Sequence, residues 1–544
     1  MARTPLMQSF VQLAAEHEIA DRLRIPVEEV RERRAEAAIS RREFLRRAGG
    51  AGLVLVGAAA LPRAAKGATA PRIVIVGGGI AGLSAALTLA DKGVASTIYE
   101  SSNRVGGRMH SQTGYWLDGQ VSEWCGEFVD SGHKTIRSLA QRFRLPLDDY
   151  YAAYPAGSSD TYYFFGNYYP KAQADADFQP VHQALQTDRQ AASYPTTYNI
   201  STPAGVALDN MSVYDWIESR VPGGHSSPLG ELLDVAYVTE FGADSNDQAA
   251  LNLVYLLAYQ PTPGNFSIFG GSDERYHIRG GSERLPKAIA AALPAESIKL
   301  GHRMVAIKLS DGTLAVTFDT GAPKTTTVTA DHVVLAFHFG VLRMLDYKNA
   351  GFDPLKQQAI KQLGLGKNDK LHLQFSTRQP WTNPGPWPGK TNGTTWSDQG
   401  YQAAWEVSVA QPGTRGIQAG YPSGSYAATF TPATPYSTIE TESKIAGYAQ
   451  QFLAQIEPVL PGLTAAWNGK ASLSVPHRDP NYNCSYSYYR VGQYHTFSGY
   501  EALRQGNIHF AGEHCTEAFQ GYMEGGAITG VAAANEILAD LKRL

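Results

Sequence analysis

The sequence predicts an α+β protein in which a discontinuous Rossmann-like domain carries an inserted domain of mixed sheet and helices. Three observations support this prediction. An apolar strand runs through a glycine-rich turn into a helix at residues 73–91, and a second glycine-rich turn leads into a helix at residues 521–540. The chain of 544 residues is long enough for two or three domains. Because one such unit lies toward each end, we expect the middle of the chain to be inserted.

The composition is that of a globular protein with a large core. Hydrophobic residues make up 43% of the chain, charged residues 18%, and the formal net charge is -3. These values indicate neither a nucleic-acid partner nor a disordered chain. The three cysteines, Cys125, Cys484 and Cys515, are too few and too scattered for a disulfide framework or a zinc site. We therefore expect buried free thiols and no metal.

The stretch "SRREFLRRAGGAGLVLVGAAALP" joins basic residues to a short apolar run. This run, from Gly49 onward, has 14 residues, whereas a membrane-spanning helix needs about 20. Its length fits the apolar region of an export signal, and the residues before it resemble the bacterial twin-arginine motif. We expect a charged helical extension at residues 1–39, a twin-arginine-type signal at residues 40–70, a periplasmic or extracellular location, and no stable membrane anchor. An internal amphipathic helix is the alternative.

A phosphate-binding unit follows this segment. Residues 73–76 are a continuous apolar run, typical of a strand that is covered on both faces. The glycines of G-x-G-x-x-G come next and allow a tight turn, close approach of a pyrophosphate and close helix packing; they are Gly77, Gly79 and Gly82. The helix at residues 81–91 turns its N-terminal amides toward the phosphate. The next strand ends at Glu100, whose carboxylate can accept both ribose hydroxyls.

The segment "RVGGR" identifies the family that this unit resembles. It places Arg104, Gly107 and Arg108 directly after the acidic residue. Together with the preceding motif, it resembles the second glycine motif of the FAD-dependent amine oxidase family, which includes monoamine, polyamine and L-amino acid oxidases. The resemblance implies an FAD cofactor with these three residues beside its pyrophosphate. The alternative is that the arginines are surface charges in a loop.

The C-terminal end and one middle segment resemble further parts of the same cofactor site. In the family, the acid of "HFAGE" holds the flavin ribityl chain, and the amide of the Met in "GYMEGG" stabilises negative charge at the flavin N1 and O2 edge. These positions correspond to Glu513, which follows Gly512, and to Met523. Val305, in a predicted hairpin with a D-G turn, matches the position where the family contacts the adenine end through a strand backbone. The family usually has Pro at the position of His338.

The resemblance implies the following domain boundaries: an FAD-binding domain at residues 71–149, 272–345 and 495–544, and a substrate domain with a helical subdomain at residues 150–271 and 346–494.

Three further residues are predicted to carry the chemistry. Tyr486, in "NCSYSYY", and Tyr522, in "GYMEG", match positions where the family places two rings on either side of the amine path. Rings exclude water and attract a docking cation through their faces. Lys370, in "LGKNDKLHLQF", resembles the lysine that holds a water against flavin N5 and assists reaction with oxygen. Core packing is the alternative for the tyrosines, and an exposed position at a strand edge for the lysine.

Departures from the family pattern bear on attachment and substrate. Ser485 stands where some members bind FAD through cysteine, so we expect non-covalent FAD. No arginine lies between Arg108 and Arg137, where secreted animal L-amino acid oxidases carry their carboxylate anchor. Other arginines could replace that anchor or could form structural ion pairs: Arg275, Arg279 and Arg490. Trp405 could line the side-chain pocket or belong to a strand core.

The resemblance implies an oxidase that acts on a small-molecule amine or amino acid and on O2. Exported bacterial enzymes with similar segments favour an L-amino acid, which would give a keto acid, ammonia and hydrogen peroxide. A primary-amine or polyamine oxidase of the monoamine oxidase type is the alternative within the family. A carotenoid-type desaturase and a catalytically silent flavoprotein scaffold are the readings from other classes. The oligomeric state, including a homodimer, stays open.

Overall fold

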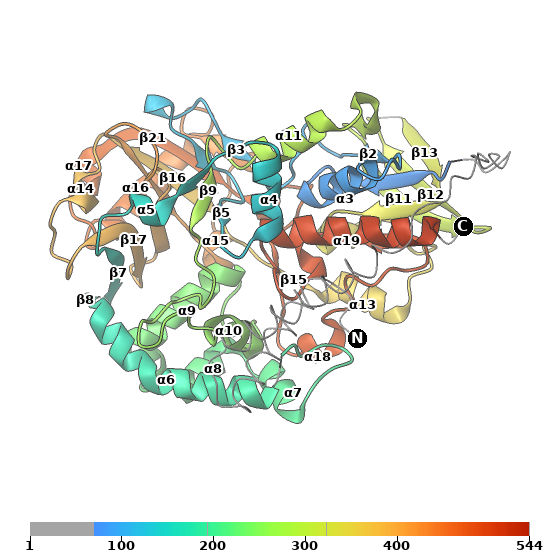
Figure 1. Cartoon of the computed structure of the whole chain (residues 1–544). Coiled ribbons are helices and arrows are strands. Elements are labelled where there is room, and N and C mark those ends of the chain that lie inside the picture. Colours follow the sequence, from blue (N-terminus) through green and yellow to red (C-terminus); the bar gives the residue numbers. More distant parts are fainter. Residues whose placement is uncertain (1–69, 193, 322–323, 543–544) are drawn as a thin grey trace, which may run out of the picture. The chain divides into compact units, whose positions relative to one another are not determined.

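The computed structural model describes residues 70–192, 194–321 and 324–542. The predicted extension and signal, up to residue 69, lie outside the described residues. Within the described part the chain mixes helices and sheets, as predicted (Figure 1). No helix there combines the length and the apolar character that crossing a lipid bilayer requires.

A five-stranded parallel sheet joins segments from distant parts of the sequence. Neighbouring strands pair in parallel in the order β10 (Ile298–Lys299), β2 (Thr97–Tyr99), β1 (Ile73–Val76), β14 (His332–Leu335) and β23 (Ile508–Phe510). Every residue of β1 is buried, which is the pattern of a strand covered on both faces. The apolar run after the predicted signal therefore forms the central strand of the sheet. One edge strand of the same sheet comes from residues 508–510, more than 400 positions later in the chain.

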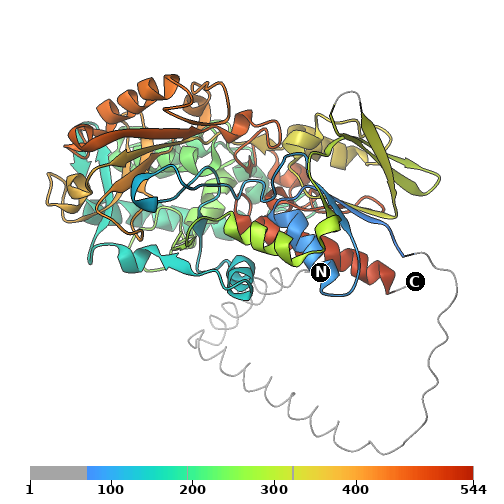
Figure 2. The same cartoon turned by 90° about the horizontal axis from the view of Figure 1, so that it is seen from above.

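Helices cover one face of this sheet. They are α3 (Ile80–Ala90), α11 (Arg284–Ala292) and α19 (Met523–Leu541). Figures 1 and 2 both show α3 beside α19. The two helices approach closely because small residues face the contact: a Cβ added to Gly530 would lie 2.0 Å from the Ala81 carbonyl oxygen. The glycines of α19 thus allow it to pack directly against α3, the helix that follows the first glycine turn.

The opposite face packs on a three-stranded antiparallel sheet. Its strands are β11 (Arg303–Ser310), β12 (Thr313–Asp319) and β13 (Thr325–Ala330). The predicted hairpin turn is confirmed, with Asp311 at φ 50° and Gly312 at φ 76°. Val74 and Val76 share a core cluster with Ile307 and Val316, whereas Ile73 and Ile75 belong to the cluster under the helices. The alternation of side chains along β1 therefore separates the two core clusters.

A second, larger sheet has eight strands. Its order is β20 (Tyr436–Thr438), β21 (Trp467–Ser474), β16 (Lys370–Phe375), β19 (Gly416–Gly420), β18 (Gln402–Glu406), β17 (Thr391–Ser397), β7 (Ser159–Phe164) and β8 (Asn167–Tyr169). β16 lies inside this sheet and is buried along its whole length. Helix α16 (Lys444–Ile456) contributes to the core beside β16 and β21.

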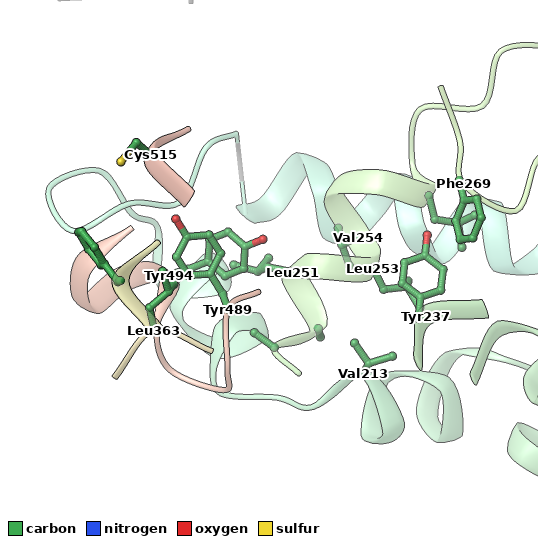
Figure 3. Packing of buried hydrophobic residues seen from close by; sticks show 14 of the residues in the cluster. Val213, Tyr237, Leu251, Leu253, Val254, Phe269, Leu363, Tyr489, Tyr494 and Cys515 are labelled. Carbon is green, nitrogen blue, oxygen red and sulfur yellow. The ribbon is translucent and has the colours of Figure 1, made fainter. Parts of the chain in front are cut away.

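A layer of helices packs near β7, β17 and β18. It consists of α6 (Lys171–Ala192), α7 (Pro203–Asp209), α8 (Val213–Arg220), α9 (Pro228–Phe241) and α10 (Ala250–Leu257). Figure 3 shows part of the hydrophobic core cluster to which this layer contributes: Tyr237 of α9 lies near Phe269, and Tyr489 lies near Tyr494. Ser227 caps the N-terminus of α9 and Gly242, at φ 65°, ends it. Gly242, whose N–H donates to the Val238 carbonyl, therefore closes the last turn of α9.

A small antiparallel sheet links the two large sheets. β9 (Tyr276–Ile278) pairs with β5 (Phe128–Val129) on one side and with β6 (Leu147–Asp149) on the other. β5 follows a two-stranded sheet of β3 (Ser111–Gln112) and β4 (Ser122–Glu123). The loops that flank β5 and β9 carry acidic residues into the cavity described below.

Candidate active site

One large cavity runs from the glycine turn after β1 to a group of aromatic rings. Its volume is about 1090 Å³, which is large enough for a cofactor and a substrate together. Eleven of the predicted site residues line it: Gly77, Gly79, Glu100, Gly107, Arg108, Lys370, Tyr486, Gly512, Glu513, Tyr522 and Met523. Segments from the start, middle and end of the described chain therefore meet in one site.

The glycine turn forms a floor without side chains. Gly77 has φ 106°, and a Cβ on it would lie 2.6 Å from the Ala336 carbonyl oxygen. Gly79 and Gly107 face each other, since a Cβ on Gly79 would lie 3.9 Å from the Gly107 Cα. Gly82 lies away from the cavity, where a Cβ would come within 2.0 Å of the Gly77 carbonyl oxygen. Only glycine lets the backbone come this close to a ligand and to the helix.

Glu100, the acidic residue after β2, lines the cavity next to the glycine turn. Glu100 Oε2 accepts a hydrogen bond from the Gly78 N–H at 2.7 Å, and Oε1 accepts one from the Ser102 N–H at 2.8 Å. Arg104 does not line the cavity. Its guanidinium donates to the Gly107 carbonyl and the Tyr482 hydroxyl, both at 2.8 Å. Arg104 thus stabilises the second glycine loop from outside the cavity.

Arg108, which is partly buried, and Glu513, which is buried, form an ion pair at the cavity wall. Arg108 Nη1 lies 3.1 Å from Glu513 Oε1 and donates to the Ser485 carbonyl at 2.6 Å. Glu513 also accepts from Ser487 and from the Gly521 N–H. Burial alone would raise the pKa of Glu513, but Arg108 and these donors lower it overall. The Glu513 carboxylate therefore stays ionised.

The geometry of this half fits a dinucleotide cofactor. The floor at Gly77 and Gly79 leaves room for a pyrophosphate next to the first turn of α3. Glu100 is placed for ribose hydroxyls, and Met523 begins α19, so its N–H points from a helix N-terminus. Val305 is not among the lining residues; its carbonyl accepts from the Asp346 N–H at 3.0 Å.

Four aromatic side chains surround the other half of the cavity. The Tyr486 and Tyr421 hydroxyls lie 3.1 Å apart, and the Tyr421 and Trp405 rings meet edge-on at 5.1 Å between centroids. The Tyr522 hydroxyl lies 3.2 Å from Glu240 Oε1. Burial raises the pKa of Tyr486 and Tyr522 well above 10, so both phenols are neutral. We call Trp405, Tyr421, Tyr486 and Tyr522 the aromatic cage.

Lys370 reaches the cavity wall from the first position of β16. Its ammonium donates to Glu127 Oε2 at 2.6 Å and to the Cys125 carbonyl at 2.9 Å, and it lies 5.5 Å from the Trp405 ring centroid. The side chain is buried, so the alternative of an exposed position at a strand edge is wrong. Glu127 also accepts from the Trp405 indole at 3.3 Å. Glu127 thereby ties the lysine to the cage.

Carboxyl groups from three segments lie near the cage, and two of them, Glu240 and Glu274, line the cavity. Glu240 lies in the last turn of α9, Asp130 follows β5 and Glu274 precedes β9. Burial raises the pKa of Glu240 to about 7 and that of Asp130 to about 6. Burial, with Glu240 and Asp130 nearby, raises the pKa of Glu274 well above its ordinary value. This half of the cavity is therefore acidic.

The three arginines considered as carboxylate anchors lie outside the cavity. Arg275 pairs with Asp149 and Arg279 with Asp148, each with an N–O distance of 2.6 Å. Arg490 lies 3.6 Å from an Asp247 oxygen. Each arginine is a structural ion-pair residue, which was the other reading of the sequence. Of the described arginines, only Arg108 and Arg303 line the cavity.

The structure adds site residues that the sequence analysis did not single out: Glu127, Glu240, Glu274 and Tyr421. Glu127, Glu240 and Glu274 had a usable signal, because they lie in segments that resemble those of exported bacterial flavin oxidases: "GEFVDSGH", "YVTEFGADSNDQAALNLVYLL" and "GGSDERYHIRGG". The cysteines near this site differ in their placement, since Cys125 lines the cavity. Ser485 lines the cavity, whereas Cys484 is fully buried and does not.

Comparisons with known proteins agree with this geometry. The family "flavin containing amine oxidoreductase" matches residues 80–538. An L-amino-acid oxidase of Crotalus adamanteus is 25% identical over 341 residues, and the match covers 59% of this chain. Another from Demansia vestigiata is 25% identical over 343 residues. The chain spans 60% of the length of each of these relatives.

Two solved structures share the fold. Cyclohexylamine oxidase from Brevibacterium oxydans superposes with a TM-score of 0.71 at 20% identity, covering 87% of this chain and all of that one. Putrescine oxidase bound to putrescine superposes with a TM-score of 0.71 at 18% identity, covering 86% of this chain and 99% of that one. At these identities the likeness establishes the fold.

Proposed function

The chain belongs to the flavin-containing amine oxidoreductase family, and from this premise we propose that it is an FAD-dependent oxidase of amino groups. The observation that carries the proposal is the aromatic cage, with the Lys370–Glu127 pair at its wall, at one end of a cavity whose other end fits a dinucleotide. Rings keep water away from a C–N bond and receive an amine through their faces.

We propose that FAD is held without a covalent bond. The backbone at Gly77 and Gly79 would bind the pyrophosphate, Glu100 the ribose and Glu513 the ribityl chain. Arg108 and the N-terminus of α19 at Met523 would offset negative charge. The chemistry that a bound flavin would supply is acceptance of a hydride from the substrate carbon and reoxidation by O2, which would yield hydrogen peroxide.

The protein's own groups would orient the substrate and set the charge around it. Tyr486 and Tyr522 stay neutral and form two walls of the cage, so the cavity favours a docking cation without adding an acid or base. Lys370 supplies a fixed positive charge, and Glu127 holds its ammonium in one position. The substrate loses a hydride from its α carbon and a proton from nitrogen, and water hydrolyses the resulting imine to a carbonyl compound and ammonia.

The first candidate substrate is an L-amino acid, supported by the relatives from Crotalus and Demansia. A primary amine or polyamine is the second candidate. It is favoured by the acidic half of the cavity and by the position of Arg275, Arg279 and Arg490 outside it. The twin-arginine-type segment at residues 40–70 supports export of the folded enzyme, so that peroxide would form outside the cytoplasm.

Peroxide release from the purified yellow protein tests the proposal. The panel contains L-amino acids, D-amino acids, monoamines and polyamines. We expect at least one amino compound to bleach the flavin without air and to yield peroxide when oxygen is readmitted. Turnover of amines alone would reverse the order of the two substrates. A flavin that no member of the panel reduces would refute an oxidase.

A further inference from the structure

The cage half of the cavity is lined by more acidic than basic residues. Five acidic residues line it: Glu127, Asp160, Glu240, Asp273 and Glu274. Lys370 is already paired with Glu127, and Lys171, near the edge of this half, is paired with Asp175. The described lining residues thus leave an excess of carboxyl groups around the space where the substrate would bind.

These carboxyl groups differ in the number of hydrogen bonds that they accept from the protein. Asp160 accepts from the Trp396 indole at 2.9 Å and from Asn392 at 2.8 Å, so it is held by the wall. Asp273 Oδ1 accepts a hydrogen bond from the Ser131 N–H at 2.8 Å. Among the described residues, the Glu240 carboxyl group accepts one hydrogen bond, from the Tyr522 hydroxyl. The carboxyl group of Glu274 has no hydrogen-bond or ion-pair partner in the part of the chain that the structure describes.

The backbone at Glu274 holds this acid in an uncommon conformation. Its φ is 43°, a region that residues other than glycine rarely occupy. The Glu274 N–H donates to Asp130 Oδ1 at 3.0 Å, which fixes the turn before β9. Such a conformation persists only where the surrounding structure imposes it, and it is often found at ligand sites. The turn therefore keeps an unpaired carboxyl group at the cavity wall.

We infer that the substrate carries two cationic groups, and that Glu274, assisted by Glu240, binds the one that is not oxidised. Removing a carboxylate from water is costly unless a counter-charge is supplied, and a dicationic ligand supplies it. The cage would receive the amino group that reacts. This chemistry is shared by α,ω-diamines and by L-amino acids with a basic side chain. The inference rests on the proposed function and specifies its substrate.

Matched substrate pairs test the inference. The ratio of kcat/KM is measured for pentane-1,5-diamine against pentylamine, and for L-lysine against L-norleucine; each pair differs in one terminal ammonium. We expect at least a tenfold preference for the dication in one pair, and that pair identifies the source. Ratios near one in both pairs would overturn the inference.

Two substitutions locate the effect. Glu274→Gln and Glu240→Gln should each lower the preference ratio, Glu274→Gln by at least tenfold. Glu296→Gln is the matched control, because the Glu296 side chain is 95% exposed and its only described partner is Lys299. The flavin absorption spectrum shows that each variant is folded and loaded. A preference that survives both cavity substitutions in loaded protein would refute the assignment to these residues.

Binding separates this inference from the proposed function. If no compound is oxidised, calorimetric titration of the same pairs into the flavin-loaded protein still tests whether the cavity binds a dication more tightly than a monocation. Binding of the dication at least tenfold tighter than its partner would support a dication site in a protein that is not an oxidase. Equal binding would overturn the dication site as well.

Discussion

The ammonium nitrogen of Lys370 lies 2.6 Å from Glu127 Oε2, although the two residues are 243 positions apart in the sequence. Lys370 begins β16, in the eight-stranded sheet, and Glu127 precedes β5, in the small linking sheet. Both side chains are buried. The pair therefore brings two sheets together at the wall of the cavity, with the lysine near the Trp405 ring.

Replacing this lysine should affect reaction with oxygen most. In Lys370→Met, the fixed positive charge that would stabilise developing negative charge is gone, and removal of one such group typically costs about 100-fold in rate. We expect reoxidation of the reduced flavin to slow by about that factor, and reduction by substrate to slow far less. Stopped-flow absorbance separates the two steps. Equal slowing of both would contradict the role assigned to Lys370.

The same pair should contribute to stability. Glu127→Gln leaves the Lys370 ammonium buried without its counter-ion, which costs about 3 kcal/mol in free energy of unfolding. The double variant Glu127→Gln/Lys370→Met should lose less than the sum of the single variants, because no lone charge remains. Urea denaturation measures all three. The exposed pair Lys299 and Glu296 is the control, where Glu296→Gln should cost about 0.5 kcal/mol or less.

Flavin content should depend on the glycine turn. Gly77→Ala puts a Cβ 2.6 Å from the Ala336 carbonyl oxygen, so the turn must shift and the pyrophosphate loses its floor. We expect the ratio of flavin to protein absorbance to fall at least fivefold. Gly93→Ala is the matched control: Gly93 also has positive φ, at 71°, but a Cβ there meets no atom within 4 Å. Equal flavin loss in both variants would attribute the effect to backbone strain alone.

Stability should depend on pH through Glu240. Its pKa is raised from 4.5 to about 7 in the fold, so the folded protein holds a proton that the unfolded chain releases. The stabilisation is present below pH 4.5 and is lost as pH rises through about 7. The midpoint of thermal unfolding should fall over this window and fall less steeply in Glu240→Gln. Glu274 lines the same cavity and Asp130 lies beside it, bonded to the Glu274 N–H, and the pKa values of both are also raised, so part of the slope should remain.

A flavin that is held without a covalent bond should leave the protein on denaturation. Acid precipitation should release the yellow colour into the supernatant, and Cys484→Ser should behave in the same way, because Cys484 is fully buried and does not line the cavity. Absorbance of the supernatant measures the release. Colour that stays with the precipitate in the natural protein, and is lost from it in Cys484→Ser, would show a covalent bond to that thiol.

Part of the site was readable from the sequence because its residues are neighbours along the chain. The strand at residues 73–76, the three glycines after it and Glu100 lie within 28 positions of one another, and the structure places them as one parallel unit. Their geometry follows from local rules of turn, helix and strand, so a motif is enough to predict it. Tyr522 was found in the same way, from the short segment "GYMEG".

The sequence by itself therefore determined the mixed fold, the glycine-turn end of the cavity and the family. The tertiary structure alone decided that Lys370 is buried and paired, that Arg275 is held by Asp149 outside the cavity, and that Glu240 and Glu274 face the cage. The physical reason is that the charge of a cavity is a sum over segments far apart in the chain. No local pattern records which ionic groups fold together and which are left without a partner.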